Sequence, residues 1–337
     1  MNTVLESINA GLHQAFRSDP HVVLLGEDVL DPYGGAFKVS RGLSSAFPDR
    51  VLTTPISEAG IVGMAAGMAL RGLRPVVEIM FGDFLTLAAD QLINHTAKYR
   101  WMYNDQVTVP LVVRTPMGGR RGYGPTHSQT LEKHFLGVPG LQVLAPTTLG
   151  KPGALLAAAI LDGRNPTLFV ENKLQYLETL PDEADLAEFE LSASGDPPNY
   201  RLKIRDAPTC DLTLAAYGYM ADLARQAVLS LAYEDEIFAE LLVPTRLAPF
   251  NPTQELEQLL DSVRNSGRLL TIEEGTYPLG WGAELLAQVV QTPGITLKAA
   301  GRVAARNLPV PASSELENTV LPQLNTILEA ARRLVLP

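Results

Sequence analysis

The sequence predicts an α/β protein with two domains. Its 337 residues exceed what one hydrophobic core usually organises. Short apolar runs typical of buried strands alternate with segments of helical periodicity, which favours parallel sheets covered by helices on both faces. An acidic stretch rich in Ser, Gly and Pro interrupts this alternation. We therefore predict a first domain over residues 1–178, a linker over residues 179–205 and a smaller second domain over residues 206–337.

The elements follow from the apolar pattern of each segment. In the first domain, strands are predicted at residues 21–29, 50–54, 75–80, 109–114, 142–145 and 167–170. Helices are predicted around them at residues 2–16, 39–47, 58–70, 81–103 and 153–161. The second domain repeats the alternation, with strands at residues 212–217, 238–243, 268–272 and 295–298 and helices at residues 220–231, 254–265, 282–290 and 315–334.

Composition narrows the class of protein. With 46% hydrophobic and 19% charged residues, the chain is expected to fold as a soluble protein with little disorder. A formal charge of −10, without any basic run, makes nucleic acid an unlikely partner. The single cysteine, Cys210, rules out an internal disulfide, and no signal peptide or membrane span is predicted. We expect a cytoplasmic protein.

Residues 54–80 are the most unusual stretch. Ser57 is expected to cap a helix that begins at Glu58, and three glycines recur in this helix at helical spacing. Each glycine weakens a lone helix by ~1 kcal/mol relative to alanine, so this face is expected to need very close packing. Glu58 is the only acidic residue of an otherwise apolar helix. It either favours the positive helix end or lies in the interior for chemistry.

A glycine-rich loop over residues 116–127 is the second candidate site. It contains Arg120 and Arg121 and ends at His127, and such a histidine can exchange protons near neutral pH. A surface imidazole is the alternative. The two arginines are expected either to meet an acidic substrate or partner or to be solvated.

Several short motifs occur along the chain in a recognisable order. They are Leu25-Gly26-Glu27-Asp28-Val29 with Tyr33-Gly34-Gly35-Ala36-Phe37, Thr54-Pro55-Ile56-Ser57-Glu58, Ala89-Asp90-Gln91-Leu92-Ile93-Asn94, His127-Ser128-Gln129, Val138-Pro139-Gly140-Leu141, and Glu273-Glu274-Gly275 with Gly280-Trp281-Gly282-Ala283-Glu284. In this order they resemble the beta subunit of the first component of 2-oxoacid dehydrogenase complexes, of the pyruvate, branched-chain or acetoin dehydrogenase type. The resemblance covers most of the chain. It implies a parallel-sheet, thiamine-diphosphate pyrimidine-binding domain followed by a smaller, transketolase C-terminal-like α/β domain.

The same resemblance implies a cofactor and an activity. Thiamine diphosphate would serve the oxidative decarboxylation of a 2-oxo acid and transfer of the acyl group to a lipoyl group. Glu58 matches the glutamate that hydrogen-bonds the cofactor's aminopyrimidine ring, and it should be shielded from water. Phe84 matches the aromatic residue that stacks on that ring, although a core phenylalanine is the alternative. Ile56 and Met80 are expected to line the same pocket.

His127 matches a histidine that serves the active site and acyl transfer. The loop departs from the family's usual pattern, because Pro125-Thr126 replaces Ala-Gln and Gly137 stands where a second histidine is common. The 2-oxo acid and the acyl acceptor are therefore left open. Asp162 and Asn165 lie in a turn that can bind potassium in the family, whereas no residue spacing suits zinc.

Half of the expected active site is missing. The Gly-Asp-Gly and Asn motif through which such enzymes hold Mg²⁺ and the cofactor's diphosphate is absent from the sequence. The resemblance therefore implies an alpha subunit that supplies Mg²⁺ in an alpha2beta2 heterotetramer, a contact between two beta chains, and a lipoyl-bearing acyltransferase as a further partner. Half of a split transketolase-like enzyme and a non-catalytic assembly subunit are the alternatives. Retention of Glu58, Phe84 and His127 argues against the latter.

Overall fold

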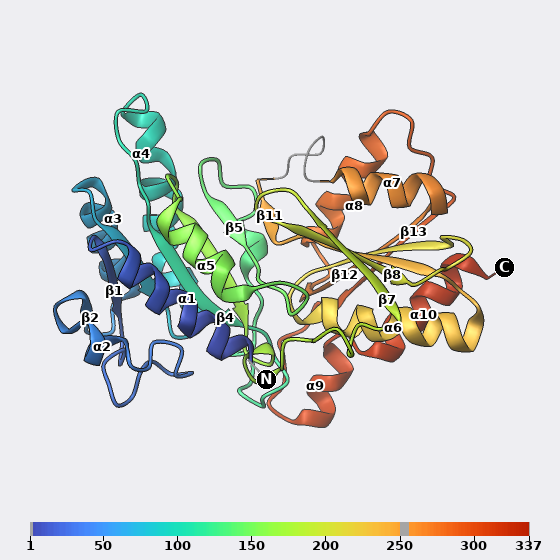
Figure 1. Ribbon diagram of the computed structural model, residues 1–337, viewed down its shortest axis with the longest axis horizontal. Coiled ribbons are helices and arrows are strands. Elements are labelled where there is room, and N and C mark those ends of the chain that lie inside the picture. Colours follow the sequence, from blue (N-terminus) through green and yellow to red (C-terminus); the bar gives the residue numbers. More distant parts are fainter. Residues whose placement is uncertain (1–2, 250–255, 337) are drawn as a thin grey trace. The chain divides into compact units, whose positions relative to one another are not determined.

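The computed structural model describes residues 3–249 and 256–336 (Figure 1). The chain divides into two compact units, which confirms the two-domain α/β expectation. The first unit comprises Met1–Gly118 and His134–Leu180, and the second comprises Gly119–Lys133 and Pro181–Pro337. Nowhere in the described ranges is a helix both long and apolar enough to cross a membrane.

Six strands of the first unit form a parallel sheet in the order β5-β6-β4-β3-β1-β2. They are β1 (Val22–Gly26), β2 (Val51–Thr53), β3 (Arg74–Glu78), β4 (Val112–Met117), β5 (Gln142–Leu144) and β6 (Thr167–Asn172). Because β1 lies between β2 and β3 and all three run in one direction, the residues that follow them gather at one edge of the sheet.

The α-helices of the first unit are α1 (Val4–Ser18), α2 (Leu43–Ala46), α3 (Glu58–Leu70), α4 (Ala97–Met102) and α5 (Pro152–Leu161). Two of them, α1 and α5, pack with almost no space between their backbones. A Cβ atom on Gly11 of α1 or on Gly153 of α5 would overlap the backbone of the other helix. Helices α1, α2 and α5 share a hydrophobic core with side chains of β1–β6. The helix expected over residues 81–103 is instead a 3₁₀ segment (Gly82–Ala88), a π-helical segment (Gln91–Thr96) and α4.

The sheet of the second unit has the order β13-β12-β9-β10-β8-β7. Its strands are β7 (Phe189–Ser194), β8 (Asn199–Ile204), β9 (Leu212–Ala216), β10 (Ala239–Val243), β12 (Arg268–Thr276) and β13 (Ala299–Ala305), and β11 (Arg246–Ala248) follows β10 along the chain. The helices are α6 (Tyr219–Asp235), α7 (Glu257–Ser266), α8 (Trp281–Gln291), α9 (Ser314–Val320) and α10 (Leu324–Val335). Within this unit, α7 and α8 cover one face of the sheet and α6 and α10 the other (Figure 1).

Three expectations for the second half differ from the structure. Residues 179–205 are not a plain linker, because β7 and β8 lie there and pair antiparallel at the sheet edge, where mostly exposed side chains hide the apolar pattern. The strand expected at 295–298 is β13, which begins at Ala299. The helix expected over 315–334 is divided into α9 and α10 around Pro322, which cannot continue a helix. The start of the helix expected from residue 254 lies outside the described residues.

Candidate active site

Glu58 is the first residue of α3 and only 5% of its surface is exposed. Ser57 precedes it, but the predicted cap is wrong, because the Ser57 side chain makes no capping hydrogen bond. The backbone of Ser57, with φ −168° and ψ 79°, departs from the extended geometry that aims an N-cap oxygen at the helix. A buried carboxyl at this place fits the interior alternative better than a solvated helix end.

A second carboxyl lies near that of Glu58. Glu27 directly follows β1 and is half-buried. Burial raises the pKa of Glu27, and the negative charges of Glu58 and Asp28 raise it further. The two segments therefore bring acidic groups close enough to repel each other, which is typical of sites that hold a proton for chemistry.

The glycine face of α3 is open in this chain. Gly60, Gly63 and Gly67 are all exposed, and so is 53% of Met64. A Cβ atom on Gly67 would meet nothing within 4 Å, and one on Gly63 would meet only the Gln91 side chain at 3.6 Å. The close packing that the glycines lead us to expect is therefore not supplied by this chain.

The other predicted cofactor-binding residues follow β2 and β3. Phe84 is half-buried, and its ring centroid lies 6.1 Å from that of Phe81, which in turn lies 5.5 Å from Phe37. Met80 is also half-buried, whereas Ile56 is 83% exposed. An aromatic row thus ends at Phe84 in the segment after β3, and the apolar side chain of Ile56, in the segment after β2, is open to solvent.

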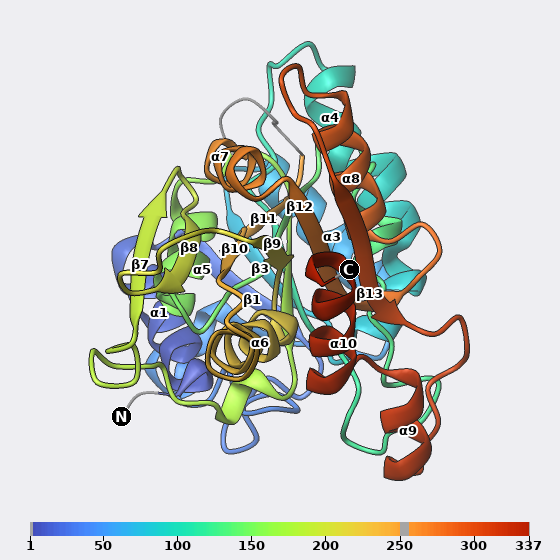
Figure 2. The same ribbon diagram turned by 90° about the vertical axis from the view of Figure 1, so that its right-hand side faces the viewer.

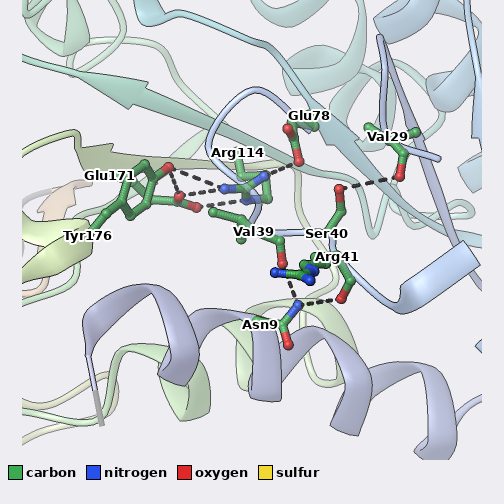
Figure 3. A network of polar contacts seen from close by, with 9 residues as sticks. All are labelled: Asn9, Val29, Val39, Ser40, Arg41, Glu78, Arg114, Glu171 and Tyr176. Carbon is green, nitrogen blue, oxygen red and sulfur yellow. Dashed lines mark hydrogen bonds and ion pairs between the residues drawn. The ribbon is translucent and has the colours of Figure 1, made fainter. Parts of the chain in front are cut away.

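A buried ion-pair network supports this edge from within the sheet (Figure 3). Arg114 of β4 donates to both carboxylate oxygens of Glu171 in β6, at 2.8 and 2.6 Å, and also donates to Glu78, the last residue of β3. The Tyr176 hydroxyl donates to Glu171 at 2.5 Å. Burial raises the pKa of Glu78, opposed by the positive charge of Arg114. This network was not predicted from the sequence, although its signal is three charged residues within apolar strands.

The network also shapes the loop after β1. Gly35 has a positive φ of 79°, and a Cβ atom there would overlap the Glu78 carboxylate, so only glycine fits. Asn9 of α1 holds the same loop by donating to the carbonyl oxygens of Val39 and Arg41 at 2.7 and 3.0 Å (Figure 3). The loop that starts near the acidic residues is therefore fixed on two sides.

His127 belongs to the second unit, in the segment Gly119–Lys133. Its ring is half-buried, and its Nδ1 atom lies 3.0 Å from the Thr126 hydroxyl oxygen. Arg120 is not solvated: only 10% of its side chain is exposed, and it forms an ion pair with Glu274 at 3.2 Å. Arg121 is exposed and is the arginine of this loop that can meet an acidic group from outside.

The predicted potassium turn belongs to the first unit. Asp162 and Asn165 are both exposed. Arg100 donates to the Asn165 side-chain oxygen, and Arg74 donates to the carbonyl oxygens of Ile160 and Gly163 at 3.0 and 3.2 Å. Guanidinium groups thus use several oxygens of this turn, and potassium binding stays a prediction. In the described part of the chain, no three His, Cys, Asp or Glu side chains are grouped to hold a metal ion.

Comparison with known proteins also divides the chain into two parts, although residues 119–133 fall within the first matched domain and not the second. The sequence matches the transketolase pyrimidine-binding domain over residues 3–178 and the transketolase C-terminal domain over residues 202–327. Among solved structures, a split-gene transketolase described as an inactive beta4 tetramer has a TM-score of 0.76 at 18% identity, covering 99% of both chains. A transketolase mutant from Pichia stipitis has a TM-score of 0.69 at 15% identity, covering 99% of this chain and 46% of that one. These likenesses show the fold.

Proteins with similar sequences identify the family more narrowly than the fold does. Subunit beta-2 of the mitochondrial pyruvate dehydrogenase E1 component from Oryza sativa subsp. japonica is 39% identical over 333 residues, covering 98% of this chain and 85% of the relative. Subunit beta of the acetoin:2,6-dichlorophenolindophenol oxidoreductase from Cupriavidus necator is 34% identical over 338 residues, covering 97% of this chain and 95% of the relative. The Saccharomyces cerevisiae pyruvate dehydrogenase E1 subunit beta is 33% identical. The chain therefore belongs to the family of thiamine-diphosphate-dependent 2-oxoacid dehydrogenase E1 beta subunits.

Proposed function

We propose that this chain supplies the pyrimidine half of the active site of a 2-oxoacid dehydrogenase that works only together with an alpha subunit. The observation that carries the proposal is the buried carboxyl of Glu58, at the first residue of α3 and beside a second acid, Glu27. A merely structural acid at a helix start would be expected in water, where its charge costs nothing.

The residues of the first unit fit the pyrimidine end of thiamine diphosphate. Glu58 offers a carboxyl shielded from water, and Phe84 offers a half-buried ring in the segment that follows β3. Met80 and the exposed Ile56 offer apolar surface that an aromatic ring would cover. These four side chains are the ones that would hold the ring.

Thiamine diphosphate, when bound, supplies the thiazolium carbon that attacks a 2-oxo acid and stores its electrons after decarboxylation. Glu58 would hold a proton toward a ring nitrogen of the pyrimidine, a task for which a water-excluded carboxyl is suited. Glu27, whose pKa is raised by burial and by the neighbouring negative charges, would supply a second carboxyl beside Glu58. His127 would move a proton for the acyl group as it passes to its acceptor, which we propose is a lipoyl group.

The open glycine face of α3 supports the partner proposal. A helix that exposes three glycines and Met64 gains stability when another chain packs against it at close range. We propose that an alpha subunit covers this face and brings Mg²⁺ and the binding site for the cofactor's diphosphate, in an alpha2beta2 heterotetramer. The second units would help to join two beta chains.

Calorimetry on the isolated, monodisperse chain tests the half-site proposal. With thiamine diphosphate and Mg²⁺ we expect no micromolar binding, because the diphosphate carries most of the charge that a protein can hold and this chain has a net charge of −10. Adding the alpha subunit should restore binding and turnover of a 2-oxo acid. Turnover by the chain alone, or activity with sugar phosphates but not with any 2-oxo acid, would refute the proposal.

A further inference from the structure

Two motifs of the second unit have no part in the chemistry described above. Glu273-Glu274-Gly275 lies near the end of β12, and Gly280-Trp281-Gly282 lies at the start of α8. The first motif contacts the segment Gly119–Lys133, hereafter the histidine loop because it carries His127, and the second contacts Tyr217, which in turn binds Glu132. Its course beside α9 is visible in Figure 2.

The start of the histidine loop is bound to β12 and α9. The Gly119 backbone N–H donates to Glu274 Oε1 at 2.7 Å, and Arg120 forms an ion pair with the same carboxylate at 3.2 Å. The Arg120 backbone N–H donates to Glu317 Oε1 at 2.6 Å, and its side chain donates to the Pro322 carbonyl oxygen. Two buried carboxylates therefore fix the chain where the loop begins.

The end of the histidine loop is bound by a second set of contacts. Glu132 is 1% exposed and accepts a hydrogen bond from the Tyr217 hydroxyl. The next residue, Lys133, donates to the carbonyl oxygens of Thr276 and Pro278 at 3.2 and 2.8 Å. The loop is thus held at both ends by groups at the carboxyl ends of β9 and β12.

The glycine–tryptophan motif shapes the support under Tyr217. The Gly282 N–H and the Arg302 guanidinium each donate to Glu273 Oε1 at 3.1 Å, and a Cβ atom on Gly280 would overlap the Glu273 carboxylate. Only glycine therefore lets α8 start so close to β12. This start places the fully buried Trp281 edge-on to Tyr217, with ring centroids 5.1 Å apart.

We propose that Glu132, Tyr217 and Glu274 are positioning residues that fix both ends of the histidine loop and so set the place of His127. The inference rests on the proposed role of His127 in the acyl step. It assigns a purpose to the two motifs: Glu274 holds the first end, while Glu273 and Trp281 hold Tyr217 in place for the second. A histidine that must meet its substrate repeatedly in one geometry needs such support.

The contact between Tyr217 and Glu132, which holds the second end of the histidine loop, is expected to depend on pH. Burial, together with the charges of Glu273 and Glu274, raises the pKa of Glu132 to about 7, against the lowering effect of the Tyr217 hydrogen bond. Arg302 pairs with Glu273 and Arg120 pairs with Glu274, and Glu132 forms no ion pair within the described ranges. Glu132 therefore gains a buried negative charge without a cation to pair with as the pH rises through about 7.

The test compares two tyrosine variants of the full chain by hydrogen exchange. Tyr217→Phe removes only the hydroxyl that Glu132 accepts from and keeps the ring on Trp281. Tyr233→Phe is the matched control, because Tyr233 also donates to a glutamate, Glu188, but is 72% exposed. We expect amides of the histidine loop to exchange about tenfold faster in Tyr217→Phe and unchanged in Tyr233→Phe.

A conservative rescue separates positioning from bulk stability. Glu132→Gln keeps an oxygen that accepts from Tyr217 and carries no charge, so the amides of its histidine loop should stay protected from exchange between pH 6 and 8. In the wild-type protein this protection should fall over the same range. In Glu132→Leu the loop should be unprotected throughout. Comparing variants at the same pH removes the intrinsic pH dependence of exchange. Equal exchange in all variants, or faster exchange spread evenly over β9, β10 and α6, would overturn the inference.

Activity of the enzyme reconstituted with its alpha subunit adds a separate readout. Tyr217→Phe should lower the rate of acyl transfer about tenfold and leave the KM for the cofactor unchanged, because the histidine loop and not the pyrimidine site is loosened. An unprotected loop with undiminished acyl transfer would overturn the positioning role alone. Protection that responds as expected in a protein inactive on every 2-oxo acid would instead count against the proposed function.

Discussion

Removing the Arg114 side chain should be the most damaging single change in the first unit. In Arg114→Met, an apolar chain of similar length replaces a guanidinium that is 1% exposed and bridges Glu78 and Glu171. Both carboxyls stay buried, at 6% and 1% exposure, without their cation. Breaking a buried ion pair by removing one partner costs about 3–5 kcal/mol.

Hydrogen exchange of peptides from β3, β4 and β6 measures this loss of stability in the strands that carry Glu78, Arg114 and Glu171. A loss of about 3–5 kcal/mol corresponds to exchange about two to four orders of magnitude faster for the most protected amides. Arg264→Met is the control, because Arg264 pairs with Asp261 at 45% and 53% side-chain exposure and such a surface pair contributes about 0–1 kcal/mol.

The sign of the pH dependence gives a second check on Arg114→Met. Without the guanidinium, burial alone should hold the pKa of Glu78 above its unfolded value. Stability from such groups is fully present below the unfolded pKa and is lost as the pH rises through the folded pKa. The variant should therefore approach wild-type protection near pH 4 and fall behind above it. A loss under about 1 kcal/mol at pH 7, or one independent of pH, would refute the argument from buried charge.

Four further outcomes follow from the candidate site. Glu58→Gln should keep the fold and abolish proton exchange at the cofactor's thiazolium carbon in the reconstituted enzyme; exchange at the wild-type rate would make Glu58 structural. His127→Ala should slow acyl transfer at least about tenfold without weakening cofactor binding, whereas the exposed His134→Ala should change neither. Glu27→Gln should raise the free energy of unfolding at pH 7, since the raised pKa of Glu27 means that its stabilising protonated form is lost with rising pH; the gain should vanish below about pH 4, and a gain that grows at low pH would contradict it. Replacing Na⁺ by K⁺ should raise thermal stability if the Asn165 turn binds potassium, and Asn165→Ala should remove the increase.

Local patterns in the sequence were enough to predict most helices and strands. The helix predicted over residues 58–70 has the same bounds as α3. An apolar run gives its length, and Arg71-Gly72 marks its end. The strands before and after it also lie where apolar runs predicted them. The β7–β8 hairpin was missed because an edge strand with one solvated face carries little apolar signal.

The sequence by itself determined the two-domain α/β class, the family resemblance and Glu58 as the acid of interest, since these depend on residue types and spacing along the chain. Tertiary structure alone decided that Arg114 neutralises two strands' glutamates and that Glu132 and Glu274 hold the two ends of the histidine loop. The reason is physical: a carboxyl's partner and burial are set by strands and loops distant in sequence, and the same residue letter is a solvated charge in one fold and a buried anchor in another.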